Sequence, residues 1–339
     1  MNRQEENKQD FVDEEKSKGL LILSQQSLDA LPINLEDILV VVQSAFIGLR
    51  QGSDNPQKTI IQPVDQRSIS YSMVGSDSTS QTVGFKVVYE FDPLRKLDSY
   101  NFHSFIFLCD DKTGQPIALM DVVKLGPLRT SATSALMAKA ACPDARTALV
   151  VGTGIQGQMA FPMLVTAMPH LEKLQIFGHY TEGIQVARDN LRRYFPDRDI
   201  EVVSSLEQAA NDADIILGVA GASARQQVRH AWMKPNSVAV LVGYGVDADV
   251  FQQANCLITT DIEQMKVTCG DLLGTDQLLP EVHAELPDIL LGRKTARKTT
   301  DDIVFAYNSG MVVTDIALGR YLVEQVQKNP ELGQRVKLW

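Results

Sequence analysis

Residues 147–167 read TALVVGTGIQGQMAFPMLVTA, and this stretch decides the expected fold. The apolar run Leu149–Val151 leads directly into a G-x-G-x-x-G sequence, and a helical pattern follows. In this context the first glycine makes a tight turn, the second lets the backbone approach a pyrophosphate, and the third lets the helix pack on the strand. The N–H groups and positive dipole of the helix N-terminus stabilise the phosphates. The alternative is an ordinary glycine turn, but the strand–helix units that follow favour a dinucleotide site. The residues expected at the cofactor here are Gly152, Thr153, Gly154, Ile155, Gln156 and Gly157.

Length, composition and charge set limits on the class of protein. A chain of 339 residues is long enough for two domains, and 44% hydrophobic and 22% charged residues are ordinary for a globular protein. The net charge of -10 argues against nucleic acid or an anionic membrane surface as a partner, because both attract positive charge. The four cysteines have no C-x-x-C spacing and the five histidines no metal-ligand spacing. We therefore expect a cytoplasmic protein without a metal site or a membrane-spanning segment.

The hydrophobic patterns divide the chain into parts. Residues 1–18 carry charges of both signs without an apolar core, so we expect a mobile tail. Residues 19–127 contain short alternating runs typical of a largely antiparallel sheet, and residues 310–339 are expected to cross back to it. Residues 128–309 alternate apolar strands with helices, which indicates a parallel sheet covered on both faces. The expected fold class is α/β, with a Rossmann dinucleotide-binding domain and a second, α+β domain. After the glycine loop, strands are expected at 174–177, 201–203, 213–219, 237–242 and 256–260.

Two cations stand in sequence contexts that favour an anionic substrate. Lys86 interrupts the apolar strand GFKVV at 84–88, where a buried amine costs several kcal/mol unless an anion accompanies it. The alternative is a lysine that points outward from an edge strand. Arg129 begins a helix rich in small residues, where its planar guanidinium can bind a carboxylate with two hydrogen bonds. The alternative for Arg129 is an interface or surface ion pair.

The end of the second Rossmann strand bears on the choice of cofactor. It carries His179 and Tyr180, where an NAD enzyme usually has an acidic residue that binds the ribose hydroxyls. Without that carboxylate, the 2′-phosphate of NADP is not repelled, and His179, Arg188 or Arg192 are candidates to bind it. The two arginines are alternatively ordinary solvated helix residues. We therefore expect NADP(H) to be preferred, with NAD(H) possible. The ends of two later strands add Val219 and Gly243 to the expected cofactor contacts.

Five segments share the order and spacing of the motifs of a known enzyme family. They are GFKVV at 84–88, DDKTGQPIALMD at 110–121, LRTSATSALMAKA at 128–140, VVGTGIQGQ at 150–158 and YNSGMVVTD at 307–315. Together they resemble the ornithine cyclodeaminase and mu-crystallin family, and the resemblance covers nearly the whole chain after the tail. It implies an enzyme in which a nicotinamide cofactor exchanges a hydride with the α-carbon of an amino or imino acid. It also implies a homodimer formed through the substrate-binding domain.

The resemblance assigns roles to individual residues. Lys86 corresponds to the family's substrate lysine and is the expected catalytic residue, and Arg129 corresponds to its carboxylate-binding arginine. Lys58 lies where many members have a second substrate arginine, so an ammonium group would take the place of a planar guanidinium. Ser309 is similar to a serine of the family that contacts the cofactor. The expected substrate-binding residues are therefore Lys58, Lys86 and Arg129.

One loop departs from the family pattern. The family's cyclodeaminases carry an aspartate after the fifth Rossmann strand, in a G-x-D-x-P-G-like loop, whereas here a shortened loop runs through Val242–Asp247. That aspartate has no clear counterpart, and Asp247 is interpreted as the acidic residue that begins the next helix. Three functions remain open: an imine reductase or amino-acid dehydrogenase, a cyclodeaminase, and a non-catalytic protein that binds a small ligand, as in the mu-crystallins. The shortened loop favours the first.

Overall fold

The computed structural model describes residues 19–65, 67–91, 102–123, 125–222, 224–274 and 278–337. The expected mobile tail at 1–18 lies outside the described residues. The chain divides into two compact units. The first contains the residues up to Ile33, Gly48–Gly126 and the residues from Met311, and the second contains Asn34–Ile47 and Pro127–Gly310. The two main boundaries between the units each lie one residue from the expected ones, at 127 and 310. Residues 34–47 were expected in the first domain but belong to the second unit.

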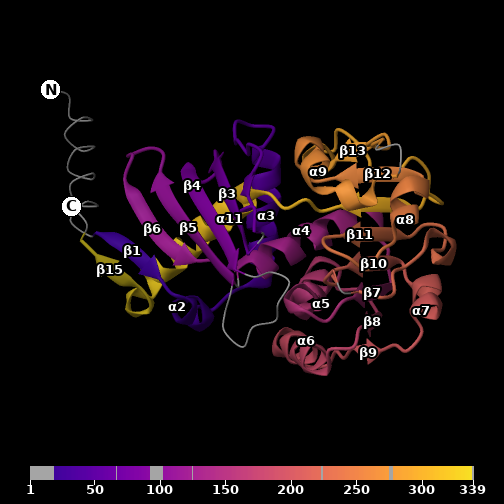
Figure 1. Ribbon diagram of the computed structural model, residues 1–339. Coiled ribbons are helices and arrows are strands. Elements are labelled where there is room, and N and C mark those ends of the chain that lie inside the picture. Colours follow the sequence, from indigo (N-terminus) through magenta and orange to yellow (C-terminus); the bar gives the residue numbers. More distant parts are fainter. Residues whose placement is uncertain are drawn as a thin grey trace. The chain divides into compact units, whose positions relative to one another are not determined.

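The first unit is built on a seven-stranded sheet with the order β15-β1-β6-β5-β4-β3-β2 (Figure 1). Strands β2 to β6 pair with one another in antiparallel order. Strand β1 pairs parallel with β6 and antiparallel with β15. A largely antiparallel sheet is therefore confirmed. The strands are β1 (Leu20–Leu23), β2 (Thr59–Ile61), β3 (Ser68–Asp77), β4 (Thr82–Phe91), β5 (Phe102–Asp110), β6 (Pro116–Asp121) and β15 (Gln334–Val336). A short helix α2 (Gln25–Ala30) and a 3₁₀ turn at Pro330–Leu332 complete the unit.

Helix α11 (Val312–Lys328) covers one face of this sheet and packs against β3, β4 and β5 (Figure 1). The helix belongs to the first unit, together with this sheet. Glycines on the sheet allow the helix to approach closely. A Cβ added at Gly75 would lie 3.0 Å from Val312 Cγ1, and a Cβ added at Gly84 would collide with the side chain of Ile316. The helix can lie this close to the sheet because glycine has no side chain at either position.

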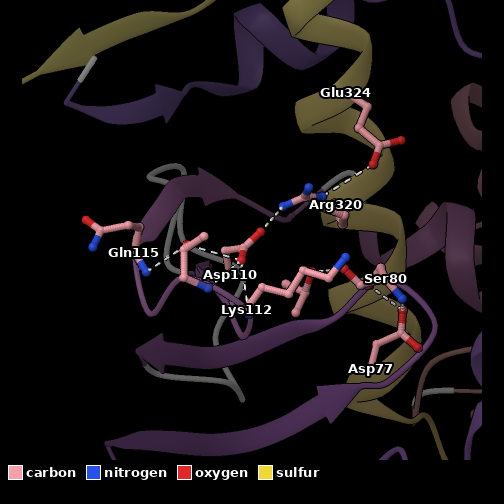
Figure 2. A network of polar contacts seen from close by, with 9 residues as sticks. Asp77, Ser80, Asp110, Lys112, Gln115, Arg320 and Glu324 are labelled. Carbon is pink, nitrogen blue, oxygen red and sulfur yellow. Dashed lines mark hydrogen bonds and ion pairs between the residues drawn. The ribbon is translucent and has the colours of Figure 1, made fainter. Parts of the chain in front are cut away.

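Aspartates hold the tight turns of the sheet and tie it to α11 (Figure 2). Asp77 accepts hydrogen bonds from Ser80 at the β3–β4 turn, and Asp110 accepts from the backbone N–H of Lys112 at the β5–β6 turn. Asp110 also pairs with Arg320 of α11, with 3.3 Å between Nη1 and Oδ2. Arg320 in turn pairs with Glu324 one turn further along the helix. The partly buried ion pair between Asp110 and Arg320 is thus one contact that joins the helix to the sheet.

The second unit contains an eight-stranded sheet with the order β13-β12-β14-β11-β10-β7-β8-β9. Every strand pair is parallel, which confirms the expected Rossmann architecture. The strands are β7 (Thr147–Val151), β8 (Lys173–Phe177), β9 (Glu201–Val202), β10 (Ile215–Gly218), β11 (Val238–Leu241), β12 (Cys256–Thr259), β13 (Ala284–Glu285) and β14 (Val304–Tyr307). Strand β14, which lies between β11 and β12, was not predicted from the sequence.

Helices lie around this parallel sheet (Figure 1). They are α5 (Ile155–Ala167), α6 (Thr181–Tyr194), α7 (Leu206–Asp212), α8 (Ala248–Gln253), α9 (Ile262–Thr268) and α10 (Leu286–Leu290), with 3₁₀ turns at His230–Trp232 and Gly270–Leu272. Most of helix α3 (Leu35–Gly48) and of helix α4 (Leu125–Ala141) also belongs to the second unit. Phe251 and Phe305 meet edge to face in the core, with ring centroids 5.3 Å apart. In the part of the chain that the structure describes, no helix combines the length and apolar character needed to cross a bilayer.

Candidate active site

The glycine loop follows β7 and leads into α5. Gly152 has φ +127°, which favours glycine, and its N–H donates to the Phe177 carbonyl oxygen at 2.9 Å. A Cβ added at Gly157 would collide with the Gly152 carbonyl oxygen, so the helix packs directly on the turn. Gly154, in contrast, has an ordinary φ of -78°, and no protein atom lies within 4 Å of a Cβ added there. Packing within the protein therefore requires Gly152 and Gly157, whereas the space at Gly154 is open to a ligand.

Three neighbouring residues of the loop differ in their surroundings. The side chain of Thr153 is buried and turned into the protein, where a Cβ at Gly178 would collide with it. Ile155 is half exposed. Gln156 has a buried Oε1 atom without a hydrogen-bond partner. An open space in front of a helix N-terminus, whose N–H groups can donate hydrogen bonds, fits the pyrophosphate of a dinucleotide.

The remaining expected cofactor residues lie at other strand ends of the same sheet. Val219 is buried, and its Cγ2 would lie 3.6 Å from a Cβ added at Gly157. A Cβ at Gly243 would lie 2.8 Å from the Ala220 carbonyl oxygen, so this glycine permits a close crossing of two loops. The hydroxyl of Ser309 shares a 2.6 Å hydrogen bond with the Thr260 hydroxyl. The structure thus holds Ser309 against Thr260, and Val219 against the glycine loop.

The end of β8 is exposed and carries no carboxylate. His179 lies edge to face with Phe177, with ring centroids 5.7 Å apart, and Tyr180 precedes α6. Arg188 and Arg192 pair with Asp199 at 3.6 Å and 3.1 Å. Their interpretation as ordinary helix residues is therefore the better one. His179 is left as the candidate for a contact with the cofactor ribose.

Arg129 lies in the N-terminal part of α4, against the loop that follows β14. Gly310 has φ +69°, and a Cβ added there would lie 3.2 Å from Arg129 Nη1. The loop is fixed by Asn308, which donates to the Thr130 carbonyl oxygen at 3.2 Å and to Ser134 Oγ at 3.0 Å. Asn308 was not among the residues predicted from the sequence, although an asparagine directly after an apolar strand is a signal for such a role. The YNSG sequence therefore shapes the surroundings of the Arg129 guanidinium.

Lys86 points from β4 toward α11 and is only 5% exposed. Its Nζ atom donates to Asp315 Oδ1 at 2.8 Å, and Asp315 is 1% exposed. An outward orientation of Lys86 on an edge strand is therefore wrong. A protein carboxylate therefore accompanies the buried amine, whereas the sequence alone favours a substrate anion at this place. Asp315 was missed, and the available signal was an acidic residue in the first turn of an otherwise apolar helix.

Lys58 lies just before β2, with its ammonium 5.6 Å from the centroid of the Tyr71 ring. Tyr71 and Met73 are two residues apart in β3 and therefore share a sheet face, and Met73 pairs with Lys86 in β4. Burial, together with the nearby carboxylate of Glu90, raises the pKa of Tyr71. Two of the expected substrate-binding cations thus lie over one face of the sheet. Arg129 belongs to the other unit.

The loop after β11 contains one acidic residue, and it is already engaged. Asp247 is the N-cap of α8, and its side chain accepts a hydrogen bond from the Asp249 N–H at 3.0 Å. This contact agrees with the interpretation of Asp247 as the residue that begins the next helix. Tyr244 donates its hydroxyl to Asp271 Oδ2 at 3.0 Å, and this hydrogen bond raises the pKa of Tyr244. Both polar side chains of this loop are therefore engaged within the protein.

Thiol and metal chemistry find no support in the described part of the chain. Burial raises the pKa of the Cys142 and Cys269 thiols, which disfavours the nucleophilic thiolate. Among the described residues, no group of three or more His, Cys, Asp or Glu side chains is placed to hold a metal ion.

Comparison with known proteins identifies the family. The model described as the ornithine cyclodeaminase/mu-crystallin family matches residues 22–329. A Delta(1)-pyrroline-2-carboxylate reductase of Bacillus cereus is 24% identical over 297 residues, which cover 83% of this chain and 89% of the relative.

Two solved structures share the fold over almost their whole length. The Thermococcus litoralis Delta(1)-pyrroline-2-carboxylate reductase in complex with NADH and L-proline has a TM-score of 0.79 at 21% identity, covering 94% of this chain and 100% of that chain. An archaeal alanine dehydrogenase dimer with bound NAD has a TM-score of 0.78 at 19% identity, covering 94% and 99%. Because the family model spans most of the sequence, this chain belongs to the ornithine cyclodeaminase/mu-crystallin family.

Proposed function

We propose that this chain is an NAD(P)H-dependent oxidoreductase acting at the α-carbon of an imino or amino acid. The observation that carries the proposal is the glycine loop, in which packing explains Gly152 and Gly157 but leaves Gly154 open to a ligand. A helix N-terminus beside that space stabilises phosphate groups. Family membership supports the reaction class, as does the similarity to proteins named as pyrroline-2-carboxylate reductase and alanine dehydrogenase.

The residues of the chain would bind and orient the substrate. Arg129 offers a planar guanidinium suited to the α-carboxylate, and Lys58 and Lys86 add ammonium groups. Lys86 also carries a proton that the imine nitrogen needs during reduction. When bound, the nicotinamide supplies or accepts the hydride. This division of roles makes Lys86 the proposed catalytic residue and makes Lys58 and Arg129 purely binding residues.

For the cofactor, we propose NADP(H) as preferred and NAD(H) as usable. The end of β8 carries His179 and Tyr180, without the carboxylate that would repel a 2′-phosphate. The two similar structures were determined with NADH and NAD bound, so use of the unphosphorylated cofactor also fits the fold. The proposed contacts are the glycine loop, His179, Tyr180, Val219, Gly243 and Ser309.

We also propose a homodimer formed through the first sheet. In β4 the residues facing α11 are buried, whereas Phe85, Val87 and Tyr89 on the opposite face are 40–50% exposed. Phe91 of the same strand and Phe105 of β5 continue this apolar surface. Extended exposed apolar surfaces of this kind usually mark a protein interface. Four free cysteines favour a reducing compartment, and we place the protein in the cytoplasm.

A cyclodeaminase is the main competing function. Ammonia release needs a positioned acid–base group, and the one acidic residue of the loop after β11, Asp247, caps a helix. Incubation with ornithine and catalytic NAD separates the two functions. We expect little or no proline, whereas stoichiometric proline and ammonia without net NADH would establish cyclodeamination.

The direct test is turnover of an imino acid. Purified protein with NADPH and a cyclic ketimine acid, or with an α-keto acid and an amine, should consume the reduced cofactor. Binding of cofactor and imino acid without any turnover would instead favour a non-catalytic ligand-binding protein.

A further inference from the structure

The Lys86–Asp315 pair joins two elements that are 229 residues apart in the sequence. Lys86 lies in the middle of β4, and Asp315 lies in the first turn of α11. Both side chains are almost fully buried, with exposures of 5% and 1%. The pair lies within the first unit, on the sheet face that also carries the ring beneath Lys58.

The local packing gives a reason for this contact. Gly84 precedes Lys86 by two residues on the same sheet face, and its missing side chain makes room for Ile316 of α11. Asp315 is the neighbour of Ile316 in the helix. Close approach of α11 at Gly84 therefore brings the Asp315 carboxylate within hydrogen-bond reach of the Lys86 ammonium.

Stability alone is a poor explanation for the pair. Desolvation of two charges offsets much of their attraction, and well-packed apolar side chains of similar volume often make a protein more stable. A buried lysine without the carboxylate would tend to lose its proton, because burial disfavours the charged form. The carboxylate thus keeps the ammonium charged and restricts its orientation.

We propose that Asp315 is a positioning residue for Lys86, a role that rests on the proposed function. In the reduction, a hydride adds to the imine carbon, the C=N π bond breaks, and the nitrogen takes a proton from the Lys86 ammonium, which solvent later restores. Asp315 holds that ammonium in place for the transfer. Because Asp315 balances the charge of Lys86, attraction of the substrate carboxylate falls mainly to Lys58 and Arg129.

This division predicts a split between kcat and KM. Asp315→Asn should lower kcat by roughly 100-fold, because Lys86 loses the carboxylate that keeps its ammonium charged and in place. KM for the imino acid should not rise, since Lys58 and Arg129, which attract the substrate carboxylate, are unchanged. Affinity for NADPH should stay within about twofold. Asp315→Glu, which keeps the carboxylate, should restore part of kcat. A raised KM with normal kcat would overturn the proposal.

A double-mutant cycle tests whether Asp315 acts through Lys86. In a Lys86→Met background, Asp315→Asn should change kcat by less than about threefold, because its partner is already gone. An equal fold-loss in both backgrounds would overturn the proposal. Thermal unfolding of the same four proteins checks folding: each single variant should lower Tm by roughly 5 °C or more, and the double variant should melt closer to the wild type.

Arg320→Gln is the matched control. Arg320 lies on the same helix and pairs with Asp110 of the same sheet (Figure 2), and its side chain is 25% exposed, whereas Asp315 is 1% exposed. It should leave kcat within about twofold of the wild type. If Arg320→Gln lowers kcat as much as Asp315→Asn, helix docking explains both and the proposal is overturned.

The proposed function and the role of Asp315 fail in different ways. Wild-type protein that binds NADPH but turns over no imino acid would overturn both. Normal wild-type turnover with an additive cycle would overturn only the role of Asp315.

Discussion

Gly84 of β4 faces Ile316 of α11 so closely that a Cβ at position 84 would collide with the isoleucine side chain. Gly84 pairs in register with Gly75, which meets Val312 in the same way. The two glycines form a flat strip on which the helix lies. The position of α11, and with it that of Asp315, therefore depends on them.

We expect Gly84→Ala to displace α11 and to weaken the contact between Lys86 and Asp315. Overpacking of this kind costs about 1–3 kcal/mol, which urea unfolding can measure. Turnover should fall along with stability. Gly126→Ala is the control, because no atom lies within 4 Å of its added Cβ and it lies within helix α4. A Gly84→Ala protein as stable and active as the wild type would contradict the packing argument.

Gly154→Val should abolish cofactor binding while leaving the protein folded. The new side chain has no protein neighbour to collide with, but it would fill the space that a pyrophosphate needs. Fluorescence titration with NADPH measures the binding, and circular dichroism the fold. Gly157→Ala provides the contrast, because its Cβ meets the Gly152 carbonyl oxygen and should destabilise the fold. If Gly154→Val binds NADPH with unchanged affinity, the assignment of the cofactor site to this loop is wrong.

The end of β8 should set the cofactor preference. We expect kcat/KM with NADPH to exceed that with NADH, and His179→Asp to reverse the order by placing a carboxylate beside the 2′-phosphate. A discrimination of about 1.4 kcal/mol would appear as a factor of about ten in kcat/KM. Equal or better turnover of the wild type with NADH at matched concentration would count against the preference.

Arg129→Ala should reduce kcat/KM for the imino acid by roughly 100-fold, because a charge-assisted contact with the carboxylate is lost. The affinity for NADPH should barely change. Steady-state kinetics and cofactor titration together make this measurement. If the variant keeps full activity but no longer dimerises in analytical ultracentrifugation, the arginine is an interface residue.

Asp214 should make the stability of the second unit depend on acid pH. It accepts hydrogen bonds from the N–H groups of Arg146 and Thr147 at 2.7 Å and 2.9 Å and pairs with Lys234 at 2.6 Å. Burial alone would raise its pKa, but the lysine and the two N–H groups together hold the pKa of Asp214 below its usual range. Its contribution is therefore fully present above about pH 4 and is lost as the pH falls through the lowered folded-state pKa.

Asp214→Asn tests this prediction through unfolding at several pH values. The variant should lose about 1–3 kcal/mol at pH 7, and its difference from the wild type should shrink below about pH 4. Asp197→Asn, on an exposed loop, is a control that should change neither value. A difference that stays constant down to the lowest pH at which the protein folds would contradict the assignment.

Much of the fold follows from local signals in the sequence. Period-two alternation over residues 82–89 indicates a strand with one buried face, and β4 (Thr82–Phe91) lies almost at these bounds. Ser205 stands three residues before Gln208, a spacing typical of a helix N-terminus, and its Oγ accepts a hydrogen bond from the Gln208 N–H at 3.3 Å. Strand β14 could not be predicted in the same way, because a four-residue apolar run is too short to show a hydrophobic period.

The sequence by itself determined the dinucleotide fold, the two-domain order and the family, because glycine turns, helix caps and hydrophobic periods act between residues close in the chain. Only the tertiary structure decided which charges meet. It paired Lys86 with Asp315 and placed Asn308 against α4. Such partners are distant in sequence and are selected by the packing of whole elements. No local pattern encodes them, since a buried charge constrains only the sign of its partner and not its position in the chain.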